Sequence, residues 1–229
     1  MSETQIIQTE SRISEASFIS GVYSWMTLAL GITGLTAFLT ATSEPLLNFI
    51  FGTRFMFMGL ILGELGLVFF LSARVRTLSN STATLLFLLY SVLNGLTFSV
   101  ILLAYTAGSI ALTFFVTAGT FGVMSFAGYF TKKDLSNFGS LMFMGLIGII
   151  IASIANYFMH SETLNYIISY IGVMVFVGLT AYDTQKLKNM AQSLDESEFK
   201  KASIMGALTL YLDFINLFLF MLRIMGGRK

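Results

Sequence analysis

The stretch Ala207-Leu-Thr-Leu-Tyr-Leu-Asp-Phe-Ile-Asn-Leu-Phe-Leu-Phe-Met-Leu222 is the last long apolar run of the chain, and it carries a carboxylate near its middle. Roughly twenty apolar residues are enough to cross a bilayer as a helix. An ionisable side chain inside such a run costs at least ~2.5 kcal/mol on insertion, so Asp213 indicates a functional site. Thr209, Asp213 and Asn216 are spaced to share one helix face. This polar face should point into protein or a water-filled cavity, and the other apolar runs must provide that interior.

The composition is that of a membrane protein. The 229 residues are 55% hydrophobic and only 11% charged, whereas a soluble domain carries about 25% charged residues. A net charge of +1 does not indicate nucleic-acid binding. The chain has no cysteine, which excludes disulfides and thiolate chemistry. The polar segment 1–17 lacks the features of a cleaved signal peptide, so we expect the first span to stay in the mature protein.

Seven apolar runs predict an all-α polytopic membrane protein with seven transmembrane helices. We place them at about Phe18–Thr42, Phe55–Ala73, Ala83–Tyr105, Ser109–Phe130, Gly139–Met159, Asn165–Tyr182 and Ser203–Met225. The runs lack the alternating apolar and polar residues of membrane strands. The prediction is therefore one transmembrane domain at 18–225, with a polar cytoplasmic tail at 1–17 and a short basic tail at 226–229.

The distribution of basic residues predicts a cytoplasmic N-terminus. Seven crossings place most basic loop residues on one side: Arg12, Arg74, Arg76, Lys132, Lys133, Lys186, Lys188, Lys200 and Lys201. The basic tail at 226–229 disagrees, because seven crossings put it on the other side. A re-entrant or short last helix would return the tail inside, but we favour seven crossings because the last run is long enough to span.

Asp183 is the second carboxylate of interest, at the cytoplasmic end of the sixth run. A helix rises 1.5 Å per residue, so Asp213 lies roughly 13 Å along the seventh apolar run from its cytoplasmic end. The side chains of Asp183 and Asp213 can therefore meet only if the sixth helix continues to about Met190. Leu187, Met190 and Ala191 recur at helical spacing and favour this continuation. Two carboxylates in a poorly hydrated site cannot both ionise cheaply and would share a proton. Loss of that proton would push the helices apart, which makes the pair a candidate pH sensor and gate.

Plainer interpretations exist for these residues. Asp183 could be an interfacial carboxylate paired with Lys186, and Asp213 could be a structural polar contact within the bundle. Arg74 and Arg76 end the second run on the same side. They could simply anchor that helix at the headgroups, or one of them could reach an aspartate and latch the second helix to the sixth and seventh.

Glu64 is the other deep carboxylate, and it should line a cavity or ion path or bond another span. Asn94 and Asn216 are its candidate partners and could line the same path. Hard cations prefer oxygen ligands, so Asp183, Asp213 and Glu64 are candidate ligands of Ca²⁺, and we expect no other cofactor. The chain contains none of the sequence patterns of zinc proteases, serine hydrolases or nucleotide-binding loops, so we expect no enzyme.

Several of these segments resemble the bacterial form of the Bax inhibitor (transmembrane Bax-inhibitor-motif) family. The matching segments are Gly172–Lys186, Ala207–Phe218, Thr131–Ser136 and Ile61–Glu64. The resemblance implies a seven-helix bundle with the last helix at its centre. It also implies a cation leak, calcium especially, that is gated by pH through two aspartates. Asp183 and Asp213 fall on those two positions, and Arg74 and Arg76 straddle the position of the family's latch arginine.

Three functions compete. The leading hypothesis is a pH-sensitive calcium or cation leak channel of the bacterial inner membrane. The second is an interaction protein that regulates membrane proteolysis or a stress response, with a membrane protease as its partner and the acidic face merely structural. The third is an intramembrane aspartyl protease of the presenilin type, suggested by Tyr182-Asp183 and Asp213. The residues before Asp213 are Leu210-Tyr-Leu212 rather than Gly-x-Gly, and the sole proline is Pro45, which speaks against this third function.

Overall fold

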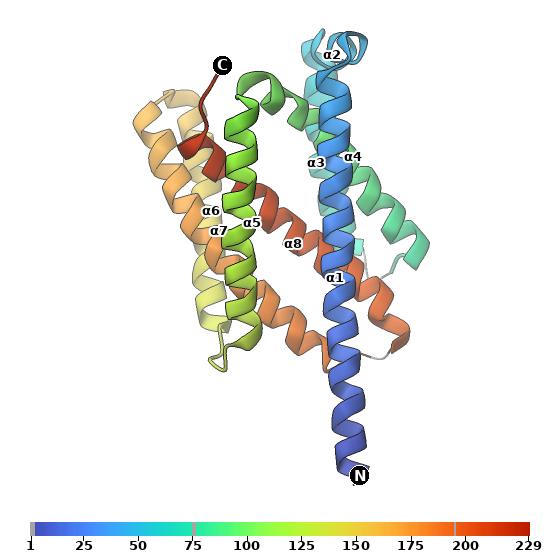
Figure 1. Cartoon of the computed structure of the whole chain (residues 1–229). Helices are drawn as coiled ribbons and strands as arrows, with labels where there is room; N and C mark the ends of the chain where they lie inside the picture. The colour runs from blue at the N-terminus through green and yellow to red at the C-terminus, as the bar shows by residue number, and fades with distance from the viewer. Residues whose placement is uncertain (1–2, 75–76, 195) are drawn as a thin grey trace. The chain divides into compact units, whose positions relative to one another are not determined.

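The computed structural model describes residues 3–74, 77–194 and 196–229, and this part of the chain is almost wholly helical (Figure 1). The helices are α1 (Glu3–Ala41), α2 (Glu44–Phe51), α3 (Arg54–Arg74), α4 (Asn80–Ala104), α5 (Ala107–Phe130), α6 (Ser136–Met159), α7 (Glu162–Ala191) and α8 (Glu196–Met225). Seven of them, all except α2, contain a segment long and apolar enough to cross a membrane. The predicted all-α polytopic membrane fold is thereby confirmed.

Two features of the helices bear on the predictions. Helix α7 runs to Ala191, well past Tyr182, so the continuation that an aspartate pair requires is present. Helix α2 was not predicted. It carries Pro45 in its first turn, where the missing N–H of proline leaves no helical hydrogen bond unmade.

The described residues form two compact units. The first comprises residues 3–104, 191–208 and 229, and the second comprises residues 105–190 and 209–228. Helix α8 therefore contributes its N-terminal part to the first unit and its C-terminal part to the second, and α7 lies in the second unit except for its last residue.

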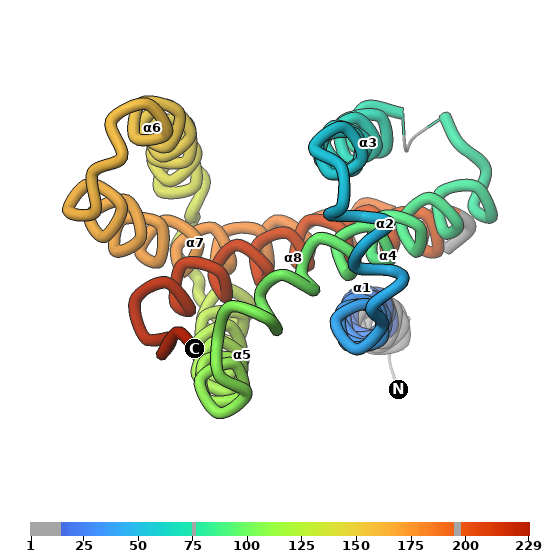
Figure 2. The backbone as a smooth tube through the Cα atoms, turned by 90° about the horizontal axis from the view of Figure 1, so that it is seen from above, coloured from blue at the N-terminus to red at the C-terminus, as the bar shows by residue number. Residues whose placement is uncertain are grey.

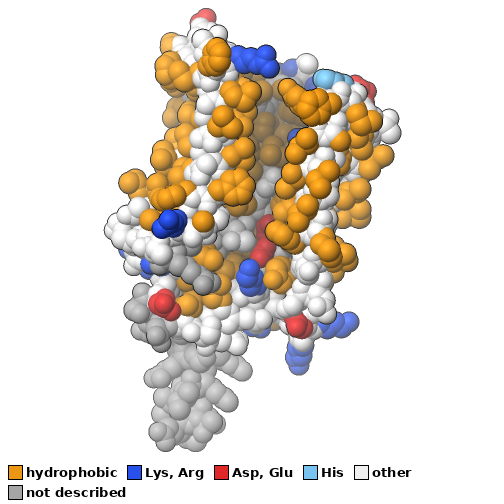
Figure 3. Space-filling model, turned by 180° about the vertical axis from the view of Figure 1, so that it is seen from behind, with side chains coloured by type: hydrophobic (Ala, Val, Ile, Leu, Met, Phe, Trp, Pro, Cys, Tyr) orange, Lys and Arg blue, Asp and Glu red, His pale blue; other side chains and the backbone are white. Residues whose placement is uncertain are grey.

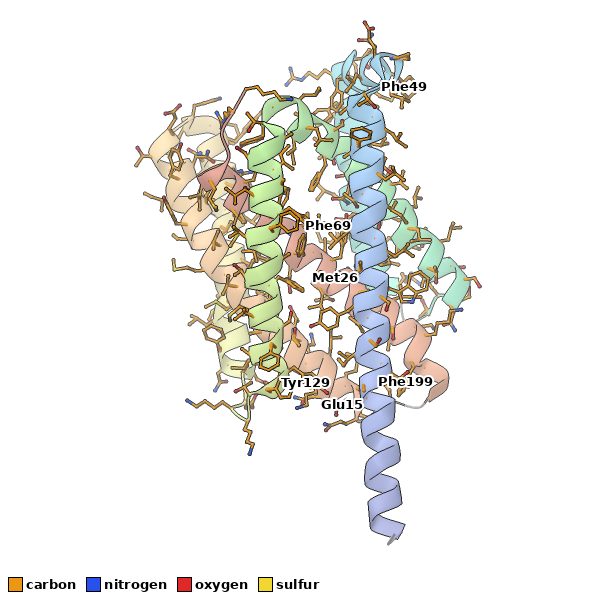
Figure 4. The ribbon with its side chains drawn as sticks, viewed as in Figure 1. Glu15, Met26, Phe49, Phe69, Tyr129 and Phe199 are labelled. Atoms are coloured by element: carbon orange, nitrogen blue, oxygen red, sulfur yellow. The ribbon has the colours of Figure 1, made fainter. Side chains whose placement is uncertain are left out.

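In the first unit, α1 packs along α4, and α3 contacts α4 from another side (Figure 2). Thr33 Oγ1 donates a hydrogen bond across this contact to the carbonyl oxygen of Ser91, at 3.0 Å. The rings of Phe18 and Phe199 pack with their centres 5.6 Å apart, and Phe199 near the start of α8 lies beside α1 in Figure 4. These contacts attach the beginning of α8 to the first unit.

In the second unit, the tail after α8 folds back onto the connection between α4 and α5. The N–H of Thr106 donates to the carbonyl oxygen of Gly227 at 3.0 Å. The N–H of Gly227 donates to Ser109 Oγ at 2.9 Å, and Tyr105 and Arg228 form an isolated bridge. The end of α8 thus lies at the beginning of α5 (Figure 1). Helix α8 is one continuous helix of 30 residues and not a hairpin, and it is long and apolar enough to cross a membrane.

The helices differ greatly in how much of their surface is buried. In the most apolar part of α8, 72% of the residues are buried. In the most apolar part of α3, only 6% are buried. The exposed faces are apolar: hydrophobic side chains cover most of the face seen in Figure 3, and Lys and Arg side chains gather mainly toward its two ends. This pattern is expected of helices that face lipid, and the extensive burial of α8 agrees with the predicted central position of the last helix.

Candidate functional site

Asp183 on α7 and Asp213 on α8 meet inside the second unit. Their side chains are buried, with 9% and 4% of their surface exposed. The two carboxyl groups form a hydrogen bond with each other. An ionised carboxylate can only accept a hydrogen bond, so a bond between two carboxyl groups requires one proton. The structure therefore brings together the two aspartates selected from the sequence, in an arrangement able to hold a shared proton.

One carboxyl oxygen of Asp213 receives no hydrogen bond from an N–H or hydroxyl donor in the described part of the chain. Among the described residues, Asp213 Oδ2 is one of three buried side-chain oxygens without a hydrogen bond. A buried polar atom left unsatisfied costs about 1–3 kcal/mol. Lys186, the alternative partner considered for Asp183, is exposed, and its Nζ lies 5.8 Å from the centre of the Tyr182 ring. Its charge still acts on Asp183, but it does not explain why Asp213 is buried beside that residue.

Two glycines allow α5 and α6 to approach α7 closely next to the pair. A Cβ atom on Gly128 of α5 would lie 2.1 Å from the carbonyl oxygen of Ala181, and one on Gly139 of α6 would lie 2.4 Å from the Tyr182 ring. Small residues at helix contacts let backbones pack closely in membranes. The segment of α7 that carries Asp183 is therefore held tightly against two neighbouring helices.

Polar contacts fix the same segment to the connection between α5 and α6. Gln185 Oε1 accepts a hydrogen bond from the N–H of Leu135 at 2.9 Å, and its Nε2 donates to the carbonyl oxygen of Lys133 at 2.8 Å. Lys188 Nζ donates to the carbonyl oxygen of Tyr129 at 2.8 Å and lies 4.8 Å from the centre of its ring, at the end of α5 (Figure 4). Gln185 was not among the predicted site residues. The sequence shows there only an uncharged polar side chain two residues after Asp183.

Glu64 belongs to a separate contact in the first unit. Its Oε1 accepts a hydrogen bond from Thr97 Oγ1 at 2.9 Å. The Nδ2 of Asn94 donates to the carbonyl oxygen of Tyr90, and the Nδ2 of Asn216 donates to that of Leu212, each within its own helix. The prediction that Asn94 is the partner of Glu64 is therefore wrong, and the partnership with Asn216, which belongs to the second unit, stays a prediction. Thr97, three residues after Asn94 on α4, takes that role.

The predicted calcium ligands belong to different units: Asp183 and Asp213 to the second, and Glu64 to the first. In residues 3–74, 77–194 and 196–229, no three His, Asp or Glu side chains lie close enough together to hold a metal ion. The set of three calcium ligands, Asp183, Asp213 and Glu64, therefore stays a prediction. Arg74 is exposed at the end of α3, and Arg76 lies outside the described residues, so the arginine latch stays a prediction.

The connection between α5 and α6 contains a carboxylate whose pKa can be tested. Hydrogen bonds from the Ser136 side chain and backbone lower the pKa of Asp134 below its ordinary value of 3.8. Because the folded pKa is the lower one, this carboxylate adds stability above pH ~3.8, and the contribution is lost as the pH falls through the folded pKa. We expect Ser136→Ala to raise the pKa of Asp134 toward its ordinary value, measured by NMR titration of that carboxyl group. The same pKa in both proteins would contradict the side-chain bond.

Comparison with known proteins gives matches over nearly the whole chain. Residues 15–229 match the family model described as "Inhibitor of apoptosis-promoting Bax1". The Escherichia coli "Inner membrane protein YbhL" is 52% identical over 96% of this chain and 95% of its own length. An uncharacterized protein of Borreliella burgdorferi is 46% identical over 93% of this chain and 92% of its own length. A Deinococcus radiodurans protein, also uncharacterized, is 44% identical over 98% of this chain and 97% of its own length.

Proposed function

The chain belongs to the Bax inhibitor family of membrane proteins, and we propose that it is a pH-sensitive leak channel for calcium or other cations. The seven apolar helices and the name of the E. coli relative, an inner membrane protein, support a multi-pass protein of the bacterial inner membrane. The excess of basic residues in loops on one side supports a cytoplasmic N-terminus.

One observation carries the proposal: the hydrogen bond between the buried carboxyl groups of Asp183 and Asp213. Ionisable residues inside a membrane span are rare, and they commonly mark ion pathways and proton relays. Here two of them face each other on neighbouring helices, and Asp213 Oδ2 has no hydrogen-bond donor among the described residues. Buried oxygens without a protein donor are groups that can bind water or a hard cation.

The pair can couple proton binding to helix separation. With one shared proton, the hydrogen bond links α7 to α8. Without it, two like charges face each other where the effective dielectric constant is low, and their repulsion is strong. The segment of α7 around Asp183 is anchored by Gly128, Gly139 and Gln185. Helix α8 is therefore the element that moves when the pair ionises, and cation flux should rise as the pH rises through that ionisation.

Calcium flux into proteoliposomes tests this mechanism. We expect the flux of the wild-type protein to depend on pH, and Asp183→Asn and Asp213→Asn each to flatten that dependence. Asparagine keeps the size of the side chain but cannot ionise. Asp134→Asn is the matched control, because it removes an exposed carboxylate of the second unit and should leave the profile unchanged. Wild-type pH profiles in both variants of the pair would remove the proposed gate.

The alternative function makes the opposite prediction. An interaction protein that regulates membrane proteolysis should give no flux at any pH and should copurify with a membrane protease. This outcome would leave the aspartate pair a structural contact and would replace the channel proposal.

A further inference from the structure

The buried face of α5 carries hydroxyl groups that the aspartate mechanism does not use. Thr113, Thr117, Phe121 and Ser125 follow one another at intervals of four residues, so they share one face of the helix. None of them is more than 6% exposed. Three of the four side chains carry hydroxyl groups, which are common at contacts between membrane helices but normally find a hydrogen-bond partner there.

This face of α5 lies against the C-terminal part of α8. Thr117 Oγ1 contacts the sulfur of Met221 at 3.3 Å. The rings of Phe121 and Phe214 meet edge to face, with their centres 5.5 Å apart. The hydroxyl groups therefore line the contact with the helix that carries Asp213, and both helix segments belong to the second unit.

The unsatisfied buried oxygens of the described residues all lie in this region. They are Thr113 Oγ1, Ser125 Oγ and Asp213 Oδ2. Buried hydroxyls in helices commonly donate to the carbonyl four residues earlier, as Thr180 and Thr184 do on α7. The hydroxyls of Thr113 and Ser125 do not. Oxygens without a protein partner are the groups that bind water or a hard cation.

An aromatic contact interrupts the row of oxygens. Phe214 packs against Phe121 and also against Phe114, with ring centres 5.5 Å and 5.7 Å apart. Along α5, Ser125 lies one turn from Phe121 toward the α5–α6 connection, and Thr113 lies two turns away in the opposite direction. A layer of rings between two polar segments excludes water, and such hydrophobic constrictions close ion channels.

We propose that the buried hydroxyl face of α5 lines the path of hydrated cations through the second unit, and that Phe121 and Phe214 form its closed constriction. The inference rests on the proposed channel function and extends it from the sensor to the pathway. Asp213 is next to Phe214 in sequence, so a movement of α8 that follows ionisation of the pair would displace the ring that closes the path.

Single cysteines can report whether water reaches this face, because the chain contains no cysteine of its own. We expect Ser125→Cys and Thr113→Cys in proteoliposomes to react with a charged, water-soluble methanethiosulfonate at least about tenfold faster than control thiols, since only a hydrated thiol ionises. The controls are Val123→Cys and Leu112→Cys, which are on the same helix at similar depth and 68% and 57% exposed on its outer surface. Equally slow reaction of all four thiols would overturn the inference.

Flux through a modified constriction gives the second readout. Phe121→Thr makes the row of hydroxyls continuous, and we expect several-fold higher flux at the pH where the wild-type flux is lowest. Phe126→Thr makes the same change on the outer surface of α5, where Phe126 is 66% exposed, and should not alter flux. Labelled thiols without flux would contradict the channel function but support a hydrated path. Flux with unreactive thiols at positions 113 and 125 would place the path elsewhere and overturn the inference while the channel function stands.

Discussion

Gly128→Ala is expected to destabilise the protein by about 3 kcal/mol, the upper end of what overpacking of a tight contact typically produces. The added Cβ would lie 2.1 Å from the carbonyl oxygen of Ala181 and 2.8 Å from its carbonyl carbon. These are backbone atoms within a helix, so no side-chain rotation can relieve the clash. Helix α5 must move away from α7, and the contacts around Asp183 must loosen with it.

Gly122→Ala is the matched control for this substitution. Gly122 is on the same helix, but a Cβ there would meet no heavy atom within 4 Å. Alanine is favoured over glycine in a helix by about 1 kcal/mol, so this variant should be as stable as the wild type or slightly more stable. Thermal unfolding of the purified proteins, followed by helical circular dichroism, compares the two. Equal stability of the two variants would contradict the close approach of α5 to α7.

The membrane helices could be predicted well because their length is imposed by the bilayer. A run of about twenty apolar residues has few alternatives to a membrane helix, and the apolar runs in the sequence match the seven long helices. Helix α2 has only 8 residues, so its apolar residues do not form a run of membrane-spanning length. The side on which the chain ends could not be decided from charge alone, because the basic tail opposes the loops. The hydrogen bonds of Gly227 place the tail beside the start of α5, and the side of the membrane on which it lies stays a prediction.

The aspartate pair was predictable for a different reason. Apolar residues at helical spacing beyond Tyr182, among them Leu187 and Ala191, predicted that α7 continues, and both are buried at 5% exposed surface. Continuation brings Asp183 to the depth of Asp213. The partner of Glu64 was not predictable in this way. Thr97 resembles any helical threonine in the sequence, and only the packing of α3 on α4 selects it as the donor.

Gln185 is the second position at which we expect a large effect. Its side chain is 8% exposed and satisfies two backbone groups of the α5–α6 connection, the N–H of Leu135 and the carbonyl oxygen of Lys133. Gln185→Leu keeps the approximate volume but removes both bonds. Each lost bond leaves a backbone group that water can reach only in part, so we expect a loss of about 2 kcal/mol in the free energy of unfolding.

Two further variants separate the anchoring role of Gln185 from a general effect of the substitution. Gln185→Glu can still accept from Leu135 but, when ionised, cannot donate to Lys133, so its loss of stability should lie between those of the wild type and Gln185→Leu. Gln192→Leu, at an exposed glutamine after α7, should change stability little. If α7 is the fixed element of the gate, Gln185→Leu should also shift the pH at which flux changes, since a loosened α7 lets the two carboxyl groups separate with less movement of α8. A Gln185→Leu protein that is less stable but keeps the wild-type pH profile would show that the anchor supports the fold and not the gate.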